Sequence, residues 1–128
     1  MAEPILRTDN LTRKASYEKA GTGMTWLKVR ILRIWDIDWY PGWAECSMYD
    51  VFGIEHRFQD KIPVFSARQL LLTDIPCDGA IRCVRTKENT DGTVIVDTGL
   101  PDGVKSLAGQ HLFSVFPNQL ADGEVFYE

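Results

Sequence analysis

The chain lacks the features that mark several large protein classes. No hydrophobic run approaches the roughly 18 apolar residues that a membrane-spanning helix requires. Hydrophobic residues make up 45% and charged residues 25% of the chain, so intrinsic disorder is excluded for most of it. Internal repeats and low-complexity segments are also missing. A chain of 128 residues is too short to form two independent cores of adequate size, so we expect one globular domain.

Cysteine and histidine are too scarce for a metal centre or a disulfide scaffold. The three cysteines (Cys46, Cys77 and Cys83) form no Cys-x-x-Cys pair, and His56 and His111 are the two histidines. A structural zinc ion needs four such ligands, so we expect no metal. Glycine-rich phosphate loops are missing as well, and we expect no cofactor. The odd number of thiols and the lack of a signal peptide favour a reduced, cytoplasmic protein.

Basic residues are outnumbered by acidic ones, which limits the partners. The net charge is −4, from 14 basic and 18 acidic residues. Residues 1–23 carry four basic and three acidic residues, which leaves −5 for the remainder. Acidic surfaces repel phosphates, so we expect binding neither to double-stranded nucleic acid nor to a membrane. A basic partner is easier to accommodate, although mild acidity is also common among small cytosolic domains.

The first 23 residues differ in character from those that follow. A short polar helix is predicted over residues 11–20, with Asn10 as its cap and Gly21 as its stop. We interpret residues 1–23 as an extension, which is an arm, a misassigned start or an expression-derived segment. Residues 24–120 then form a single β domain, and residues 121–128 form a C-terminal tail.

No sustained helical periodicity follows residue 24, and the pattern favours strands. Asp-Gly pairs at 78–79, 91–92, 102–103 and 122–123 favour turns. The runs between turns predict strands over residues 26–37, 43–50, 54–60, 80–88, 93–98 and 111–116. Helical turns are predicted at 66–72 and 117–120. We therefore expect an all-β protein, a five- or six-stranded antiparallel barrel or sandwich of OB-like or SH3-like size, with one or two short helical turns at most.

One hairpin has a predictable register. A three-residue loop with Gly53 in the left-handed conformation sets Asp50 opposite Ile54. This register separates core from solvent cleanly, whereas a two-residue loop would mix the two faces. The predicted inward residues are Ala44, Cys46, Met48, Ile54, His56 and Phe58, and the predicted outward residues are Glu45, Ser47, Tyr49, Glu55, Arg57 and Gln59. Arg57 is expected to contact Ser47 and, diagonally, Glu45 or Tyr49.

Aromatic residues concentrate between the first two strands. Three of the four tryptophans lie in the segment Ile34-Trp35-Asp36-Ile37-Asp38-Trp39-Tyr40-Pro41-Gly42-Trp43, whereas Trp26 is expected in the core. Tyr40-Pro41-Gly42 predicts a type II turn. Strand alternation would place Trp35, Ile37 and Trp39 on one side and the two aspartates on the other.

This aromatic segment has two interpretations. The tryptophans either fill the open end of a small barrel or form a rigid binding surface whose acids attract a basic partner. Stacking against a sugar or a single-stranded base is a further possibility. The candidate binding residues are Trp35, Asp36, Asp38, Trp39, Tyr40 and Trp43.

Catalytic patterns are weak. Cys46 lies near His56 across the predicted hairpin, and a Cys-His nucleophile pair is conceivable. Both residues are expected to face the core, where a thiol is inert. His111 has no partner nearby in the sequence. We therefore assign no catalytic residue and expect a protein that is not an enzyme.

A scattered set of residues supports a family-level comparison. The set is Tyr40-Pro41-Gly42, Glu45, Gly53, His56, Phe58, Asp60-Lys61, Pro63-Val64, Gly103, Ser106, Gly109, Phe113, Val115 and Gln119-Leu120. Over about residues 24–120 this pattern resembles small uncharacterised bacterial single-domain all-β proteins, which implies a compact bacterial domain. In size and acidity the chain is also similar to immunity proteins of bacterial toxin systems.

These observations lead to one expected function and one alternative. We expect a non-enzymatic protein-interaction module of a bacterial cytoplasmic protein, immunity- or inhibitor-like, that binds a protein partner through the Trp-rich acidic loop. The alternative is a binder of small ligands or of single-stranded nucleic acid on an OB-like barrel. The sequence leaves the oligomeric state open.

Overall fold

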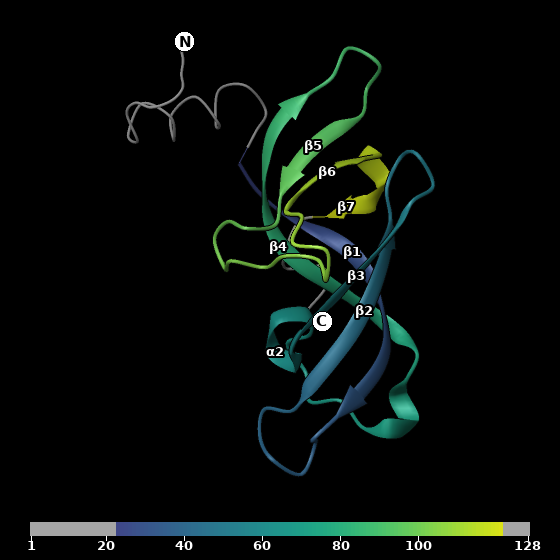
Figure 1. The fold of residues 1–128 in the computed structure, drawn as a ribbon, viewed down its shortest axis with the longest axis vertical. Helices are drawn as coiled ribbons and strands as arrows, with labels where there is room; N and C mark the ends of the chain where they lie inside the picture. The colour runs from purple at the N-terminus through teal and green to yellow at the C-terminus, as the bar shows by residue number, and fades with distance from the viewer. Residues whose placement is uncertain (1–22, 122–128) are drawn as a thin grey trace.

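The computed structural model describes residues 23–121, which form one strongly curled antiparallel sheet (Figure 1). Its strands are β1 (Gly23–Trp35), β2 (Trp43–Tyr49), β3 (Glu55–Lys61), β4 (Cys77–Glu88), β5 (Val94–Asp97), β6 (Leu112–Val115) and β7 (Leu120–Ala121). The helix α2 (Ile62–Phe65) and the 3-10 turns η1 (Leu72–Asp74) and η2 (Pro117–Gln119) complete it. The predicted fold class, an all-β protein with a small antiparallel barrel or sandwich, is confirmed, and its form is a curled half-barrel sheet.

The terminal predictions fall mostly beyond this range. Apart from Gly23 and Ala121, the expected N-terminal extension, its short helix and the C-terminal tail lie outside the described residues. Within residues 23–121, no helix combines the length and apolar character needed to cross a membrane.

Strand β1 organises the sheet, whose order is β3-β2-β1-β4-β5-β6. One edge of β1 pairs with β4. The other edge is shared, because Trp26 and Leu27 pair with β7 whereas the stretch from Arg30 to Trp35 pairs with β2. A register shift between Ile31 and Arg33 marks a bulge, which bends a strand and increases its twist. The long, bent β1 thus lets the sheet curl around a single core.

The core lies inside this curl and is built from alternate residues of the strands. Burying each large apolar side chain stabilises the fold by about 1.5–3 kcal/mol. The largest fully buried side chains are Phe58, Phe65, Phe113, Leu27, Ile31 and Ile81. Trp26 is not among the core residues, because alternation along β1 turns Leu27 inward and leaves the indole half-buried on the outward face. The expectation that Trp26 is a core residue is therefore wrong.

The opening between the edge strands β3 and β6 is closed without strand pairing. Phe58 and Phe113 meet edge to face across it, with ring centroids 5.6 Å apart. Two backbone hydrogen bonds add to this contact: Leu107 N–H donates to the Arg57 carbonyl (2.8 Å), and Val51 N–H donates to the Ser114 carbonyl (3.0 Å). Loop and turn segments therefore cover the edge backbone that a half-barrel leaves open.

The β2–β3 hairpin has the predicted register, with Cys46 opposite Phe58 and Met48 opposite His56. Gly53 adopts a φ of 78°, and Asp50 N–H donates to the Ile54 carbonyl at 3.0 Å. One inward assignment is wrong, because Ile54 is 54% exposed. The residue belongs to the turn, before β3 begins at Glu55, and so lies beyond the core.

The helical turn predicted at 66–72 is misplaced. Helix α2 comes earlier in the chain and ends at Phe65, and the N–H of the following Ser66 donates to the Ile62 carbonyl. Pro63 explains the position, since the fixed φ of proline suits the first turn of a helix. The turn predicted near residue 117 is confirmed as η2.

Candidate functional site

The connection between β1 and β2, residues 35–43, forms a compact aromatic turn. Strand β1 ends at Trp35 because Asp36 adopts a left-handed conformation (φ 56°), which aspartate tolerates better than most residues. Trp39 N–H then donates to the Asp36 carbonyl at 3.1 Å, and Gly42 N–H donates to the Trp39 carbonyl at 2.8 Å. The aromatic turn is therefore two successive hydrogen-bonded turns rather than an extended strand end.

Two predictions about this segment are wrong. The Tyr40–Pro41 peptide bond is cis, so the expected type II turn is a type VI turn with proline at its third position. Strand alternation stops at Trp35, so Trp35, Ile37 and Trp39 do not share one side: Ile37 packs against the core, whereas Trp39 is 78% exposed. Gly42 has the positive φ expected of it (75°).

The aromatic side chains divide into a stacked pair and an exposed pair. Trp35 and Trp43 stack with ring centroids 6.5 Å apart and 15° between their planes. Trp39 and Tyr40 are 78% and 85% exposed, so they do not fill the end of the barrel. Arg33 places its guanidinium carbon 4.8 Å from the centroid of the Trp35 ring, in cation–π geometry.

Asp36 and Asp38 are exposed beside these rings. Within residues 23–121, neither carboxylate has a hydrogen-bond or ion-pair partner. Lys61 lies opposite Trp43 in the β2–β3 register and is also exposed. The structure thus brings all six predicted binding residues into one turn, with two acids available to a partner.

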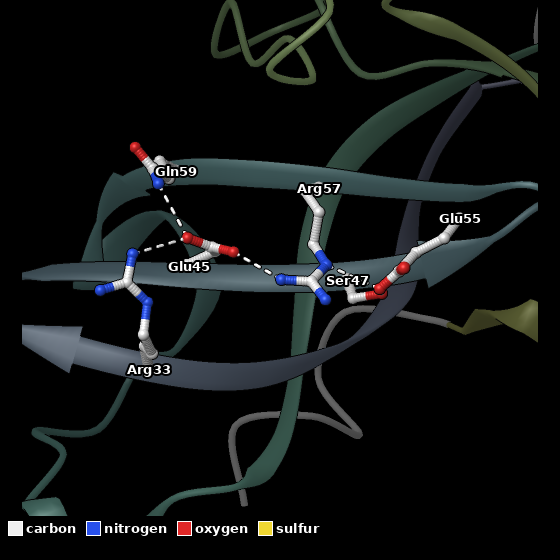
Figure 2. A network of polar contacts seen from close by, with 6 residues as sticks. All are labelled: Arg33, Glu45, Ser47, Glu55, Arg57 and Gln59. Carbon is white, nitrogen blue, oxygen red and sulfur yellow. Dashed lines mark hydrogen bonds and ion pairs between the residues drawn. The ribbon is translucent and has the colours of Figure 1, made fainter.

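A polar network covers the outward face of β1, β2 and β3 next to the aromatic turn. Figure 2 shows Glu45 at its centre, receiving hydrogen bonds from Arg33 (2.8 Å), Gln59 (2.8 Å) and Arg57 (2.6 Å). Arg57 also donates to Glu55 (2.6 Å), which accepts a bond from the Ser47 hydroxyl (2.7 Å) as well. The predicted contact between Arg57 and Glu45 is confirmed, and we call this set the Glu45 network.

The network changes the chemistry of Glu45. The side chain faces outward as predicted, yet its neighbours cover it so well that the residue is only 8% exposed. The hydrogen bonds from Arg33 and Gln59, with Arg57, lower its pKa to about 2 although burial opposes this. Glu45 is therefore ionised at neutral pH and cannot donate a proton as a general acid. Its role is to tie three strands together under the aromatic turn.

A cavity of about 300 Å³ adjoins the aromatic turn on the side of α2. Its floor is apolar, and its walls include rings of tyrosine and proline. The floor includes Ile37, Ile62 and Leu70, and the walls include Tyr40, Pro41 and Pro63. The sequence pattern gave no sign of this cavity, because it depends on the return of residues 62–70 to the aromatic turn.

Both histidines have aspartate partners that sequence spacing did not reveal. His56 Nε2 lies 2.8 Å from Asp50 Oδ2, and both side chains are nearly buried. His111 Nδ1 lies 2.8 Å from Asp97 Oδ1, which also accepts the Gly99 N–H. The second pair borders a shallow, open cavity of about 240 Å³.

The conceivable Cys46–His56 nucleophile pair lacks support. Cys46 is fully buried opposite Phe58, whereas His56 is opposite Met48 and bonded to Asp50. Burial raises the pKa of the Cys46 thiol well above its usual range, which keeps it protonated at neutral pH. The absence of enzymatic activity itself stays a prediction.

In the described part of the chain, no three His, Cys, Asp or Glu side chains gather in a way that could hold a metal ion. No protein-family model, curated protein or solved structure matches the chain. The resemblance to small bacterial domains therefore stays a prediction, and function has to be inferred from the aromatic turn and its surroundings.

Proposed function

We propose that this chain is a non-enzymatic protein-interaction module that binds a basic protein partner through its aromatic turn. One observation carries the proposal: Trp39 and Tyr40 are 78% and 85% exposed on a turn whose backbone is held by hydrogen bonds. Exposed aromatic side chains in a fixed geometry are typical of interface hot spots, where tryptophan and tyrosine dominate the binding energy.

The surroundings of the turn favour tight binding. The stack of Trp35 on Trp43 holds the two ends of the turn together, and the Glu45 network links the adjoining strands. An ordered loop loses less conformational entropy on binding than a flexible one. Tyrosine and tryptophan add to this advantage, because each has few rotatable bonds for its contact area.

Charge indicates the kind of partner. Asp36 and Asp38 flank the exposed rings without a partner among the described residues, and the chain carries a net charge of −4. Acids at the rim of an apolar hot spot accelerate association with a basic surface and repel an acidic one. An immunity- or inhibitor-like role in a bacterial cytoplasm belongs to this proposal, since covering a basic surface is one way to neutralise it.

A second candidate is a stacking platform for a sugar or a single-stranded base. It is favoured by Trp43, which is 38% exposed and lies opposite the cation Lys61. Base–aromatic stacking contributes about 1–3 kcal/mol per base. The two unpartnered acids of the same turn oppose a phosphate backbone, so we rank this candidate second.

Affinity capture from the native host with matched variants tests the proposal. Trp39→Ala and Tyr40→Ala remove the exposed rings, and Phe52→Ala is the control, since Phe52 is 75% exposed on the β2–β3 turn at the other end of the molecule (Figure 1). We expect a basic protein to be retained by the wild type and by Phe52→Ala but lost by the other two variants.

Equal capture by all variants would remove the aromatic turn as the binding surface. Tryptophan fluorescence that is quenched by an oligonucleotide or oligosaccharide, and no longer quenched in Trp43→Ala, would instead support the stacking platform.

A further inference from the structure

We infer that the cavity beside the aromatic turn receives one aromatic side chain of the partner, and that lysine or arginine flanks this side chain in the partner's sequence. The inference rests on the proposed function and specifies the partner's chemistry. It combines a cavity that has an apolar floor, although Ser66, Arg68 and Gln69 also line it, with two acids of the adjacent turn that have no partner within residues 23–121. We call this site the Tyr40 cavity, after the exposed residue that forms its outer wall.

The size and floor of the Tyr40 cavity suit a single large side chain. Its volume is about 300 Å³, at the lower end of the range for ligand pockets. Ile62 and Leu70 in its floor are 5% and 2% exposed, so they are held by the core and cannot close the space easily. An apolar side chain binds favourably on a rigid apolar floor, because burying that side chain needs no rearrangement of the domain.

The walls favour an aromatic ring over a branched aliphatic side chain. Tyr40, Pro41 and Pro63, which all carry rings, line the cavity. Flat rings pack against other flat rings over a large area, and pairs of aromatic rings gain further energy from edge-to-face or offset contacts. Tyr40 is 85% exposed, so its ring has free surface that an entering aromatic side chain can cover.

The charges around the cavity favour basic flanks. Ile37, which lines the cavity, lies between Asp36 and Asp38 in the chain, so both exposed acids are its sequence neighbours although neither lines the cavity. Arg68 also lines the cavity, and its charge is paired with Asp74, with 3.4 Å between Nη1 and Oδ2. Lys61, next to Ile62, is an exposed cation, but within residues 23–121 the charges of the turn itself that have no partner are the two aspartates. A lysine or arginine on either side of an inserted ring gains by contact with them.

Selection from a library of random peptides, displayed on phage and panned on the folded chain, tests this inference even while the partner is unidentified. We expect enriched sequences to share an aromatic residue next to lysine or arginine. A synthetic peptide of the consensus should lose about tenfold or more in affinity when its aromatic residue is replaced by alanine. Replacing its basic residues by glutamate should weaken binding at least as much as replacing them by alanine.

Matched variants of the protein locate the bound peptide. Ala67→Trp adds an indole at the exposed rim of the cavity, and Ala108→Trp makes the same change in an exposed loop that does not line it. The first should weaken peptide binding about tenfold, and the second should leave it unchanged. Tyr40→Ala removes a wall of the cavity at a residue that is 85% exposed, so it tests the site without affecting folding.

The acids have their own control. Asp36→Asn keeps a residue that tolerates the positive φ of this position, and Asp38→Asn removes the second charge. Glu88→Gln removes an exposed charge at the distant end of β4. We expect the double aspartate variant to bind the peptide more weakly and with less dependence on salt, and Glu88→Gln to bind as the wild type does.

Three outcomes would overturn the inference: no enriched peptide, a consensus without an aromatic or basic residue, or equal peptide affinity of the Ala67→Trp and Ala108→Trp variants. Failure of the inference can be separated from failure of the proposed function. If Trp39→Ala abolishes capture of the native partner while Ala67→Trp does not, the turn binds and the cavity is not used. If neither variant changes capture, both proposals fail.

Discussion

Trp35 and Trp43 are the last residue pair of the β1–β2 ladder, and their indole rings stack with 15° between the planes. The stack lies where the aromatic turn leaves and re-enters the sheet. Trp35 is covered further by the Arg33 guanidinium, which also bonds Glu45. The tryptophans of this segment therefore have different roles: Trp35 and Trp43 stabilise the turn, whereas Trp39 extends into solvent.

This division predicts unequal effects on stability. Trp43→Ala should lower the free energy of unfolding by about 1–2 kcal/mol, because it removes an aromatic pair together with its partial burial. Trp39→Ala should change it by no more than about 0.5 kcal/mol, as for other surface substitutions. Urea unfolding followed by far-UV circular dichroism measures both. Equal losses would contradict the assignment of separate roles.

The Glu45 network predicts a specific loss of stability in acid. The pKa of Glu45 is about 2 in the folded protein against an ordinary value of 4.5. Its contribution is therefore fully present above pH 4.5 and is lost as the pH falls towards 2. Glu45→Gln should be less stable than the wild type at neutral pH, and the difference should shrink steadily below pH 4.5. Urea midpoints measured across this range give the comparison.

Glu88→Gln is the control for that experiment, since Glu88 is exposed at the end of β4 and lies outside the network. It should show no comparable pH-dependent difference from the wild type. A constant difference between Glu45→Gln and the wild type at all pH values would mean that the charge of Glu45 does not stabilise the fold.

Asp50 is expected to be the residue on which the β2–β3 hairpin depends most. Its carboxylate accepts the N–H groups of Phe52 and Ile54 and contacts His56. Asp50→Ala should cost about 2 kcal/mol, because it removes the acceptor of two turn N–H groups and the partner of the nearly buried His56 ring. Asp91→Ala is the matched control, since Asp91 makes similar turn contacts but is exposed. Thermal unfolding should show the larger decrease in Tm for Asp50→Ala.

The same carboxylate titrates in a predictable direction. Burial raises the pKa of Asp50, but the bonds from His56 and the two backbone N–H groups outweigh this and lower it below 3.8. The stability that Asp50 contributes is present above pH 3.8 and is lost as the pH falls through the lowered value. NMR titration of the side-chain carboxyl carbon checks the direction. A pKa above 3.8 would contradict the described contacts.

The thiols should differ in reactivity. Burial raises the pKa of Cys83 to about 12 and that of Cys46 well above its usual range, whereas Cys77 is partly exposed. Iodoacetamide at neutral pH should label Cys77 first and the other two after unfolding in urea. Mass spectrometry of the labelled peptides identifies the sites. Fast labelling of Cys46 in the folded protein would revive the Cys46–His56 thiol hypothesis.

The sequence predicted the regular part of the fold better than the candidate site. The β2–β3 register followed from strict alternation and the glycine at Gly53, two local signals that agree. The aromatic turn was placed correctly, but its geometry was not, because the left-handed Asp36 and the cis Tyr40–Pro41 bond leave no distinct mark in the pattern. Trp35, Ile37 and Trp39, which strand alternation would place on one side, therefore do not share a side.

Long-range features were out of reach for a related reason. The Tyr40 cavity needs the segment after β3 to return to the aromatic turn, and the pairing of His111 with Asp97 needs β5 to lie beside β6. Neither follows from spacing along the chain. The coverage of outward-facing Glu45 was missed as well, since it depends on Arg33 from a third strand.

Binding of a basic protein by the exposed rings of the aromatic turn is the proposal on which the others depend. Its sharpest test is the dissociation constant of the captured partner for Trp39→Ala, for Phe52→Ala and for the wild type, measured side by side. We predict a loss of about tenfold or more for Trp39→Ala and no significant change for Phe52→Ala. Equal affinity of the two variants, or a loss confined to Phe52→Ala, would contradict the proposal.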